Sequence, residues 1–212
     1  MRIGPMVLAA SVAAAVTGSR TARAEGAGEE VKVGDPAPSF TLPLYNAEAQ
    51  QRAMFSLDGT VGPDAEDPNV KAVLLSFFAT FCGPCKREMP YLEKLQEEFR
   101  DQGLRVVMIS IDRDDEAAAK IAALAKQNKI SFPILKDRFN FLARRYLGET
   151  APLPSVFIVS REGMVRELSR GYGKDASTFL RASVQKALGL ADTKGPVAGG
   201  AKGPIVPAPR AN

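Results

Sequence analysis

Residues 72–89 read AVLLSFFATFCGPCKREM, and this stretch decides the fold. Its first part, Ala72–Phe78, is an apolar run of branched and aromatic side chains, which is typical of a strand buried on both faces. The motif Cys-Gly-Pro-Cys follows at 82–85, and apolar residues recur at helical spacing from Glu88 to Arg100. The stretch therefore predicts a strand that passes directly into a helix, with two cysteines at the turn between them.

Strand and helix patterns alternate through the rest of the chain. Further strands are expected at Leu104–Ile111, Ser155–Val159 and Met164–Ser169, and further helices at Glu116–Asn128, which Asp114 or Asp115 can cap, and at Asp175–Gly189. This alternation predicts an α/β domain over residues 31–190, with a central mixed, mainly parallel sheet flanked by helices. Because Gly34–Leu42 and Met54–Leu57 precede the first buried strand, we expect an N-terminal extension there, either an extended lead-in or an added hairpin.

The two ends of the chain differ from this domain. Residues 1–24 combine a positive start at Arg2, a short apolar stretch and the small-x-small sequence Ala22-Arg-Ala24, which is the pattern of a secretory signal peptide. A buried core helix is the alternative, but the segment lacks a polar face. We expect export to an oxidising, extracytoplasmic or periplasmic compartment, with membrane attachment if the signal stays uncleaved. Residues 191–212, mostly Ala, Gly, Pro, Lys and Val, predict a disordered tail.

Composition excludes several kinds of site. The 212 residues include no histidine and only two cysteines, so histidine-dependent catalysis, a histidine-ligated metal and a four-cysteine zinc site are all excluded. The net charge of +4 belongs to the ends, because residues 25–190 carry −1. Nucleic-acid binding needs positive charge on the folded domain, so nucleic acid is not an expected partner.

The place of the two cysteines predicts redox chemistry. Free backbone N–H groups at a helix N-terminus stabilise a thiolate, so Cys82, expected at the exposed tip, is the candidate nucleophile. Cys85, one turn further in, is the candidate resolving thiol, and Lys86 and Arg87 add positive potential. Two thiols carry two electrons, so no cofactor is expected. The other interpretations are half of a zinc site, which lacks further ligands, and an inert disulfide, which would stabilise little across so short a loop.

The segment Phe77–Pro90 resembles the active-site segment of the thioredoxin superfamily and is most similar to the exported TlpA/ResA-like thiol–disulfide oxidoreductases. The resemblance extends from Gly34-Asp-Pro-Ala-Pro-Ser-Phe40 to the last expected helix. It includes the extra βα unit, here at 104–130, that this branch inserts into the thioredoxin fold. It also implies that Pro90 kinks the active-site helix.

The resemblance implies a substrate-binding surface around the cysteines. Pro154 matches the cis-proline that faces the cysteine pair, and Leu153 would offer its backbone to a bound substrate peptide. The remaining members of the expected surface are Phe81, Gly83 and Pro84. Phe81 stands where the family usually has tryptophan, which keeps an apolar side chain but loses an N–H donor.

Two further positions concern proton transfer. Glu88 matches an acid that ResA-like proteins place near the cysteines, where it is implicated in proton handling for the inner thiol. A solvated acid in the first turn of the helix, favoured by the helix dipole, is an equal alternative. Ser76 occupies the place where cytosolic thioredoxins carry a buried aspartate, so that proton acceptor is missing.

These features together predict thiol–disulfide exchange. Cys82 would attack a substrate disulfide, and Cys85 would resolve the mixed disulfide. The Gly-Pro dipeptide is that of thioredoxin, whose reduction potential is about −270 mV, so we expect a reductant of protein disulfides. The resemblance implies a membrane thiol as electron donor and apocytochrome c as the leading substrate.

The sequence also bears on three other functions. A peroxiredoxin-like peroxidase would share the fold, but Leu75 and Ala79 occupy the proline and threonine places of its Pro-x-x-x-Thr-x-x-Cys motif. A Sco-type copper chaperone needs a histidine ligand, and the chain has none. A non-catalytic thioredoxin-like interaction domain stays open, and for it the change Cys82→Ala would have no consequence.

Overall fold

The computed structural model of the chain describes residues 30–114 and 116–190. The predicted signal peptide (1–24), the predicted tail (191–212) and the candidate cap Asp115 lie outside the described residues. None of the helices within the described part has both the length and the apolar character needed to cross a membrane.

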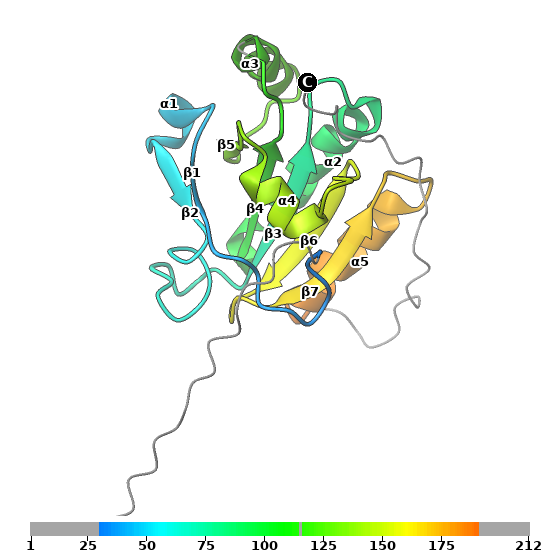
Figure 1. Ribbon diagram of the computed structural model, residues 1–212. Helices are drawn as coiled ribbons and strands as arrows, with labels where there is room; N and C mark the ends of the chain where they lie inside the picture. The colour runs from blue at the N-terminus through cyan, green and yellow to red at the C-terminus, as the bar shows by residue number, and fades with distance from the viewer. Residues whose placement is uncertain (1–29, 115, 191–212) are drawn as a thin grey trace, which may run out of the picture.

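Five strands of the described residues form a central sheet in the order β5-β4-β3-β6-β7 (Figure 1). They are β3 (Ala72–Phe78), β4 (Leu104–Ser110), β5 (Ile134–Lys136), β6 (Ser155–Ser160) and β7 (Val165–Arg170). β3 pairs in parallel with β4, and β4 with β5, whereas β6 runs antiparallel to both β3 and β7. The sheet is therefore mixed, as predicted, and among its five strands only β6 runs opposite to the others.

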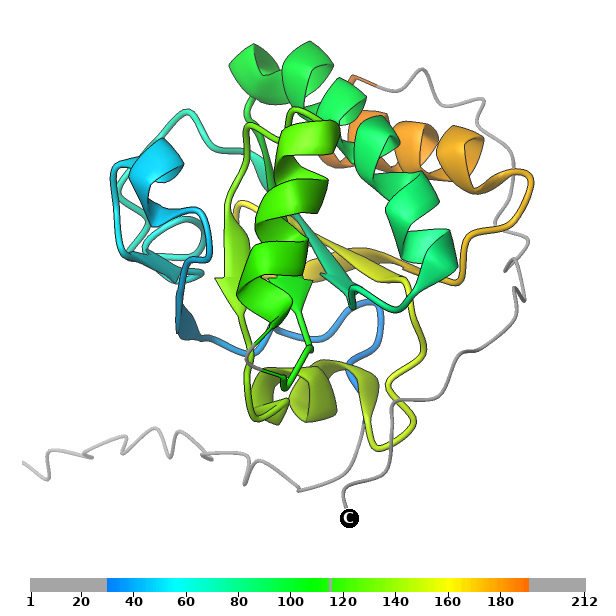
Figure 2. The same ribbon diagram turned by 90° about the horizontal axis from the view of Figure 1, so that it is seen from above.

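Helices cover both faces of this sheet (Figure 2). One face carries α2 (Gly83–Phe99), α3 (Ala117–Gln127) and α5 (Ala176–Ala187), and the other carries α4 (Phe141–Leu147). A short 3₁₀ turn, Arg100–Gln102, joins α2 to β4, so the βα unit predicted at 104–130 is present as β4 and α3. β5 and α4 were not predicted, because segments of three and seven residues show too few periods of any pattern.

The cap predicted for α3 is wrong for Asp114. Glu116 occupies the N-cap position, and the Ala117 N–H is bonded to the backbone carbonyl of Asp114 at 3.3 Å. The Asp114 carboxylate lies instead 3.9 Å from the Lys120 ammonium, which draws it away from the helix amides. The predicted end of α5 is confirmed, since Gly189 has a left-handed φ of 72° just beyond it.

The N-terminal extension is a hairpin, which is one of the two forms expected. β1 (Thr41–Pro43) pairs antiparallel with β2 (Met54–Ser56), and α1 (Ala47–Gln50) lies between them (Figure 1). A bridge between Leu44 and Leu135 ties the hairpin to β5, the outer strand of the central sheet.

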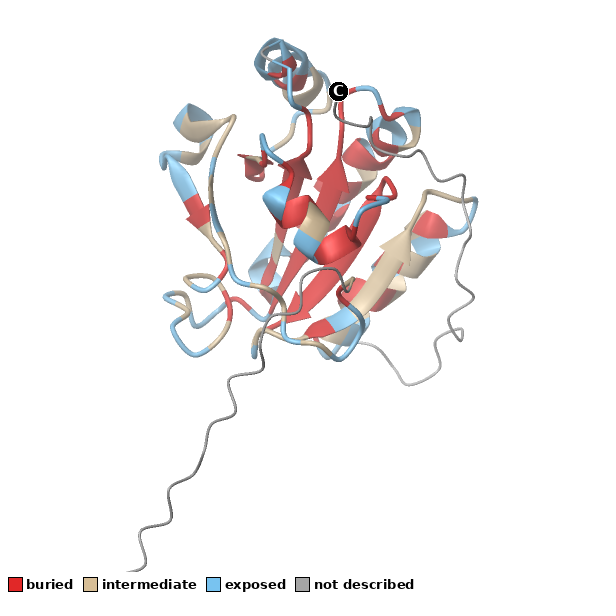
Figure 3. Cartoon of the chain, in the orientation of Figure 1, coloured by how far each residue is buried: buried red, intermediate tan, exposed pale blue. Residues whose placement is uncertain are grey.

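The central strands of the sheet are more deeply buried than the edge strand β7 (Figure 3). All residues of β3 and β6 are buried, and β4 is buried except at Arg105, whereas most of β7 is partly exposed. The apolar runs seen in the sequence are thus the central strands. On the α4 face, Tyr146 packs edge-on against Phe157 with ring centroids 5.1 Å apart, and its hydroxyl donates to the Pro38 carbonyl at 2.8 Å.

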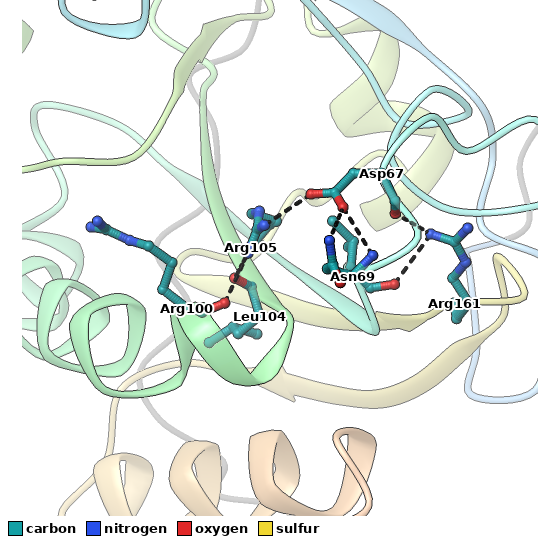
Figure 4. Close-up of polar contacts among 7 residues, drawn as sticks. Asp67, Asn69, Arg100, Leu104, Arg105 and Arg161 are labelled. Carbon is teal, nitrogen blue, oxygen red and sulfur yellow. Dashed lines mark hydrogen bonds and ion pairs between the residues drawn. The ribbon is translucent and has the colours of Figure 1, made fainter.

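A polar cluster lies at the amino end of β4 (Figure 4). Because β3 runs parallel to β4 and leads to the cysteines at its carboxyl end, the cluster is at the opposite end of the sheet from them. Arg105 donates from Nη2 to the Asp67 carboxylate at 3.1 Å. Arg161 donates from Nη1 to the Asp67 and Val70 carbonyl oxygens, at 2.6 and 3.2 Å. These bonds hold the polar loop before β3 against β4 and the β6–β7 turn.

Candidate active site

The two cysteines lie where β3 passes into α2. Cys82 is the N-cap of α2, and its Sγ accepts a hydrogen bond from the Cys85 N–H at 3.2 Å. The two sulfurs form a disulfide of 2.04 Å, with the Cα atoms 5.3 Å apart. Pro84 stands in the first turn of the helix, where its missing N–H has no intrahelical partner to lose.

The expected exposure of Cys82 is wrong. Its exposed fraction is 0%, and that of Cys85 is 1%. The reason is local geometry, because the Cys82 sulfur turns back over the first turn of α2, towards the Cys85 amide and sulfur. The exposed surface here belongs to the neighbours Phe81, which is 51% exposed, and Gly83. A partner therefore meets these residues before it meets either sulfur.

Two cations adjoin this turn. Lys86 and Arg87 are both exposed, and an Arg87 guanidinium nitrogen lies 3.8 Å from the place that a Cβ on Gly83 would take. This guanidinium therefore stands over the first residue of α2. Its charge adds to the positive end of the helix dipole, and both stabilise a thiolate at Cys82.

The Leu153–Pro154 peptide bond is cis, as the family resemblance implied. In the sheet register Ser155 pairs with Phe77, so Pro154 lies beside the end of β3 that leads to the cysteines. The Pro154 carbonyl accepts the Gly171 N–H at 2.7 Å, which fixes the segment against the loop after β7. Both Leu153 and Pro154 are buried, and the binding of substrate by the Leu153 backbone stays a prediction.

Glu88 is a buried acid, so the alternative of a solvated helix acid is wrong. Its exposed fraction is 2%, and the Ser76 hydroxyl donates to Glu88 Oε2 at 2.9 Å. Burial raises the pKa of Glu88 to about 7, against the opposing effect of the Ser76 hydrogen bond. Glu88 follows Cys85 by three residues and shares its side of α2. The helix therefore places a group that exchanges protons near neutral pH beside the inner cysteine.

Ser76 explains how this site differs from that of a cytosolic thioredoxin. The residue is fully buried in β3, at the position where the thioredoxin resemblance places an aspartate. Here the hydroxyl supports the carboxyl of Glu88 instead of supplying a carboxyl of its own. The sequence identified both residues but not their contact, which joins a strand to a helix.

Asp112 is a site residue that sequence reasoning missed. Its carboxylate, 2% exposed, accepts the Thr80 N–H at 3.1 and 3.0 Å and the Thr80 hydroxyl at 2.7 Å. The Ser110 hydroxyl donates to the same carboxylate at 2.8 Å. Asp112 therefore holds the β3–α2 turn, two residues before Cys82, against the end of β4. The available signal was an acid directly after a buried strand, at the edge where parallel strands place functional residues.

No group of three or more cysteine, aspartate or glutamate side chains within 30–114 and 116–190 is arranged to hold a metal ion. The arrangement offers a dithiol pair, a buried proton acceptor and positive charge at a helix N-terminus. These groups suffice for the exchange of two electrons between thiols and disulfides.

Residues 33–168 match the AhpC/TSA family. The chain is 28% identical over 140 residues to the thiol-disulfide oxidoreductase ResA of Oceanobacillus iheyensis, an alignment that covers 66% of each protein and so just under two thirds of that relative. It is 33% identical over 126 residues to the thioredoxin-like protein YneN of Bacillus subtilis, covering 58% of this chain and 72% of that one.

Solved structures share the fold. A putative thiol:disulfide interchange protein DsbE from Chlorobium tepidum superposes with a TM-score of 0.62 at 23% identity, covering 75% of this chain and 99% of the other. A putative protein disulfide isomerase from Bacteroides thetaiotaomicron gives a TM-score of 0.63 at 26% identity, covering 76% and 93%. These likenesses establish a thioredoxin-like fold.

Proposed function

This chain belongs to the AhpC/TSA family, and we propose that it is a thiol–disulfide oxidoreductase that reduces disulfides in a few exported proteins, apocytochrome c foremost. The observation that supports this most directly is the Cys82–Cys85 disulfide at the N-terminus of α2, on the same helix as the buried acid Glu88. Both the redox couple and a proton acceptor are thus within one helical segment.

The proposed reaction starts from the reduced pair. The Cys82 thiolate attacks one sulfur of a substrate disulfide, and the other substrate sulfur leaves as a thiolate that takes up a proton. Cys85 then loses its proton, for which the Glu88 carboxylate is the nearby acceptor, and attacks Cys82 Sγ. The Cys82–Cys85 disulfide forms as the second substrate thiol departs. Two electrons have passed from the enzyme to the substrate.

The remaining roles follow from position. Phe81, Gly83 and Pro84 stand at the surface around the disulfide, and Pro154 with Leu153 reaches the same edge of the sheet. We assign these residues to the binding of the substrate segment. The return to the dithiol needs an electron donor, for which we propose a membrane thiol protein. The signal-like sequence of residues 1–24 supports an extracytoplasmic, periplasmic setting, with attachment to the membrane where the signal is kept.

The reduction potential of the Cys82–Cys85 pair tests the direction of this reaction. The purified chain is equilibrated with glutathione redox buffers, and the dithiol fraction is measured by thiol alkylation. A potential below about −220 mV supports a reductant, and one near about −120 mV contradicts it, because that is the potential of a dedicated oxidant.

Substrate trapping tests the partner class. The variant Cys85→Ala leaves Cys82 unable to be resolved, so a substrate stays attached as a mixed disulfide. The matched control is the double variant Cys82→Ala/Cys85→Ala, which traps nothing if Cys82 is the nucleophile. Recovery of apocytochrome c on the single variant supports the proposed substrate. Rapid consumption of hydrogen peroxide with no disulfide reduction would instead identify a peroxidase.

A further inference from the structure

A buried serine of the central strand β3 faces the helix that carries the cysteines. Side chains on a strand alternate between its two faces, and the ring of Phe77 packs against Tyr146 on the α4 face, with the centroids 5.4 Å apart. The neighbouring Ser76 therefore points to the other face, which α2 covers (Figure 2). Ser76 is fully buried and has Met108 of β4 and Val156 of β6 on either side. A hydroxyl in such a place needs a partner within the protein.

The partner of this hydroxyl is Glu88. Ser76 Oγ donates to Glu88 Oε2 at 2.9 Å, and this bond joins the strand to the helix. Glu88 belongs to the buried side of α2, together with Cys85, Met89 and Leu92. Residues three positions apart are neighbours on the surface of a helix. The carboxyl therefore lies beside the inner cysteine while one of its oxygens is bonded to β3.

Glu88 has one hydrogen-bond donor where a buried carboxylate ordinarily has several. Within residues 30–114 and 116–190, no second donor to this carboxyl and no cation paired with it is present, although the side chain is only 2% exposed. Burial disfavours the charged form, and the bond from Ser76 favours it. The first effect is the larger, and it raises the pKa of Glu88 to about 7. The hydroxyl of Ser76 is thus the group that keeps part of this acid ionised at neutral pH.

Two further polar groups face Glu88 from outside β3. Tyr172, in the loop after β7, is close enough for the charges of Glu88 and Arg87 to act on its phenol. Burial raises the pKa of Tyr172, so the phenol is neutral at pH 7. Arg87 is exposed, lies near Gly83, and as an arginine keeps its charge. Of these groups, the Glu88 carboxyl is the one that can take a proton from Cys85 near neutral pH.

We propose that Ser76 is a positioning residue for the second step of the exchange, in which its hydroxyl holds the Glu88 carboxylate in place to accept the proton of Cys85. The inference rests on the proposed function and concerns its resolving step. Glu88 Oε1, the oxygen that Ser76 does not bond, takes the proton from the Cys85 sulfur. The Cys85 thiolate then forms a bond to Cys82 Sγ, and the bond from Cys82 to the substrate sulfur breaks. The substrate sulfur leaves with the electron pair and takes up a proton, and Ser76 keeps its own proton throughout.

The hydroxyl contributes in two ways, and one substitution removes both. It raises the fraction of molecules that have an ionised acceptor at pH 7, and it fixes the carboxyl between β3 and Cys85. Ser76→Ala removes the hydroxyl and leaves a slightly smaller apolar side chain among apolar neighbours. Because no unpaired donor remains at this position, the variant is expected to fold.

The mixed disulfide between the chain and its substrate measures the resolving step directly. The reduced full-length protein is mixed with an excess of a peptide disulfide and quenched in acid, and mass spectrometry gives the fraction of chain attached to peptide. The formation of this species measures attack by Cys82, and its decay measures attack by Cys85. For the original chain, the decay rate should rise with pH, with a midpoint close to the pKa of about 7 of Glu88.

Ser76→Ala should move this midpoint to higher pH. At pH 7 we expect the decay to slow by about tenfold, which corresponds to the loss of a hydrogen bond to a charged group, while formation through Cys82 keeps its rate. At about pH 9 the two decay rates should converge, because Glu88 is then ionised in both proteins. The matched control is Ser160→Ala. Ser160 lies at the opposite end of the neighbouring strand β6, and its hydroxyl also donates to a glutamate, Glu162 Oε2, at 2.6 Å. This control should leave both rates and the midpoint unchanged.

A double variant shows whether Ser76 acts through Glu88. In Glu88→Gln the acceptor is lost, so the decay should be slow at pH 7 and lack the midpoint, and the addition of Ser76→Ala should change nothing further. Identical decay profiles for Ser76→Ala and the original chain, or a further slowing in the double variant, would overturn the role assigned to Ser76 and leave the proposed function intact. If the original chain forms no mixed disulfide and reduces no peptide, the proposed function fails, and the role of Ser76 fails with it.

Discussion

The two ends of the central sheet use acidic residues in opposite ways. At the carboxyl end, Glu88 and Asp112 are each 2% exposed and accept hydrogen bonds from hydroxyl and backbone N–H groups. At the amino end, the Asp67 side chain is 44% exposed and meets the Arg105 guanidinium at 3.1 Å (Figure 4). Carboxyl groups are thus buried among hydroxyl and N–H donors at one end of the sheet, and partly exposed beside an arginine at the other.

This difference in burial decides which of the two ends carries an acid that titrates near neutral pH. Burial raises the pKa of Glu88 to about 7, whereas a hydrogen bond from the Asn69 backbone holds the pKa of Asp67 below its usual range. Asp67 is therefore charged at neutral pH. Of these two acids, Glu88, at the end where the cysteines lie, is the one that changes its protonation in the pH range in which thiols exchange with disulfides.

The largest expected difference between the two ends is in activity. Cys82→Ser removes the thiolate nucleophile, so reduction of a peptide disulfide should fall to the uncatalysed background. Arg105→Lys at the amino end is the matched change and should leave the rate unaltered. Both are measured by the release of thiols from the peptide at pH 7. Reduction by Cys82→Ser at the original rate would show that the proposed site is not the catalytic one.

A large loss of stability is expected at Asp112. Asp112→Ala leaves the buried Thr80 N–H and hydroxyl without their acceptor, which should lower the free energy of unfolding by about 4 kcal/mol. Asp112→Asn keeps one acceptor oxygen and should cost less. Unfolding in urea at pH 7 measures both variants. Full stability in Asp112→Ala would mean that the β3–α2 turn holds its shape without this carboxylate.

The Asp112 variants also separate positioning from folding. A merely structural role would leave the reduction potential of the folded variant unchanged. A buried negative charge near the turn disfavours the Cys82 thiolate, so Asp112→Asn should lower the pKa of the Cys82 thiol and make the potential less negative. Thiol alkylation rates against pH give the pKa, and glutathione buffers give the potential.

The change of stability with pH measures the effect of the raised pKa of Glu88. Its folded pKa of about 7 exceeds the ordinary value of 4.5, so between these pH values the folded state binds more protons than the unfolded one. The free energy of unfolding should therefore fall as pH rises from about 4.5 to 8, by about 3 kcal/mol from this group alone. Glu88→Gln, which does not ionise, should remove that decline. Urea unfolding of both proteins at several pH values measures the difference, and parallel pH profiles would contradict a raised pKa.

The elements with a strong pattern were predictable from the sequence. β3 and β4 are continuous apolar runs because both faces are covered, and α2 follows from the spacing of its apolar residues. α4 was not predicted, because it has only seven residues and begins after Asn140, whose backbone is left-handed. The residue at the N-cap position therefore gives no capping signal, because the helix amide is capped from Asp137, three residues before Asn140.

In the candidate site, too, local features were predictable from the sequence and contacts between distant residues were not. The cysteine pair was predictable because the motif and its strand-to-helix context are local in sequence. The contact between Ser76 and Glu88 spans twelve residues, and that between Thr80 and Asp112 spans thirty-two. Such pairs meet only when a strand, a helix and a neighbouring strand pack together. The burial of Cys82 is different, because it comes from local geometry that the residue pattern does not show: the sulfur turns back over the first turn of α2.

The smallest expected effect is at Asp67. Asp67→Asn removes the ion pair with Arg105 but leaves both bonds from Arg161, which go to backbone carbonyls of this loop. An exposed pair contributes little and is screened by salt, so the loss in the urea midpoint should be far below that of Asp112→Ala and vanish at 1 M salt. The sign with pH is also opposite to that of Glu88, since a lowered folded pKa gives stability that is present above the unfolded pKa and lost in acid. A salt-independent loss as large as that at Asp112 would mean that the exposed end of the sheet is held as firmly by charge as the buried end is by hydrogen bonds.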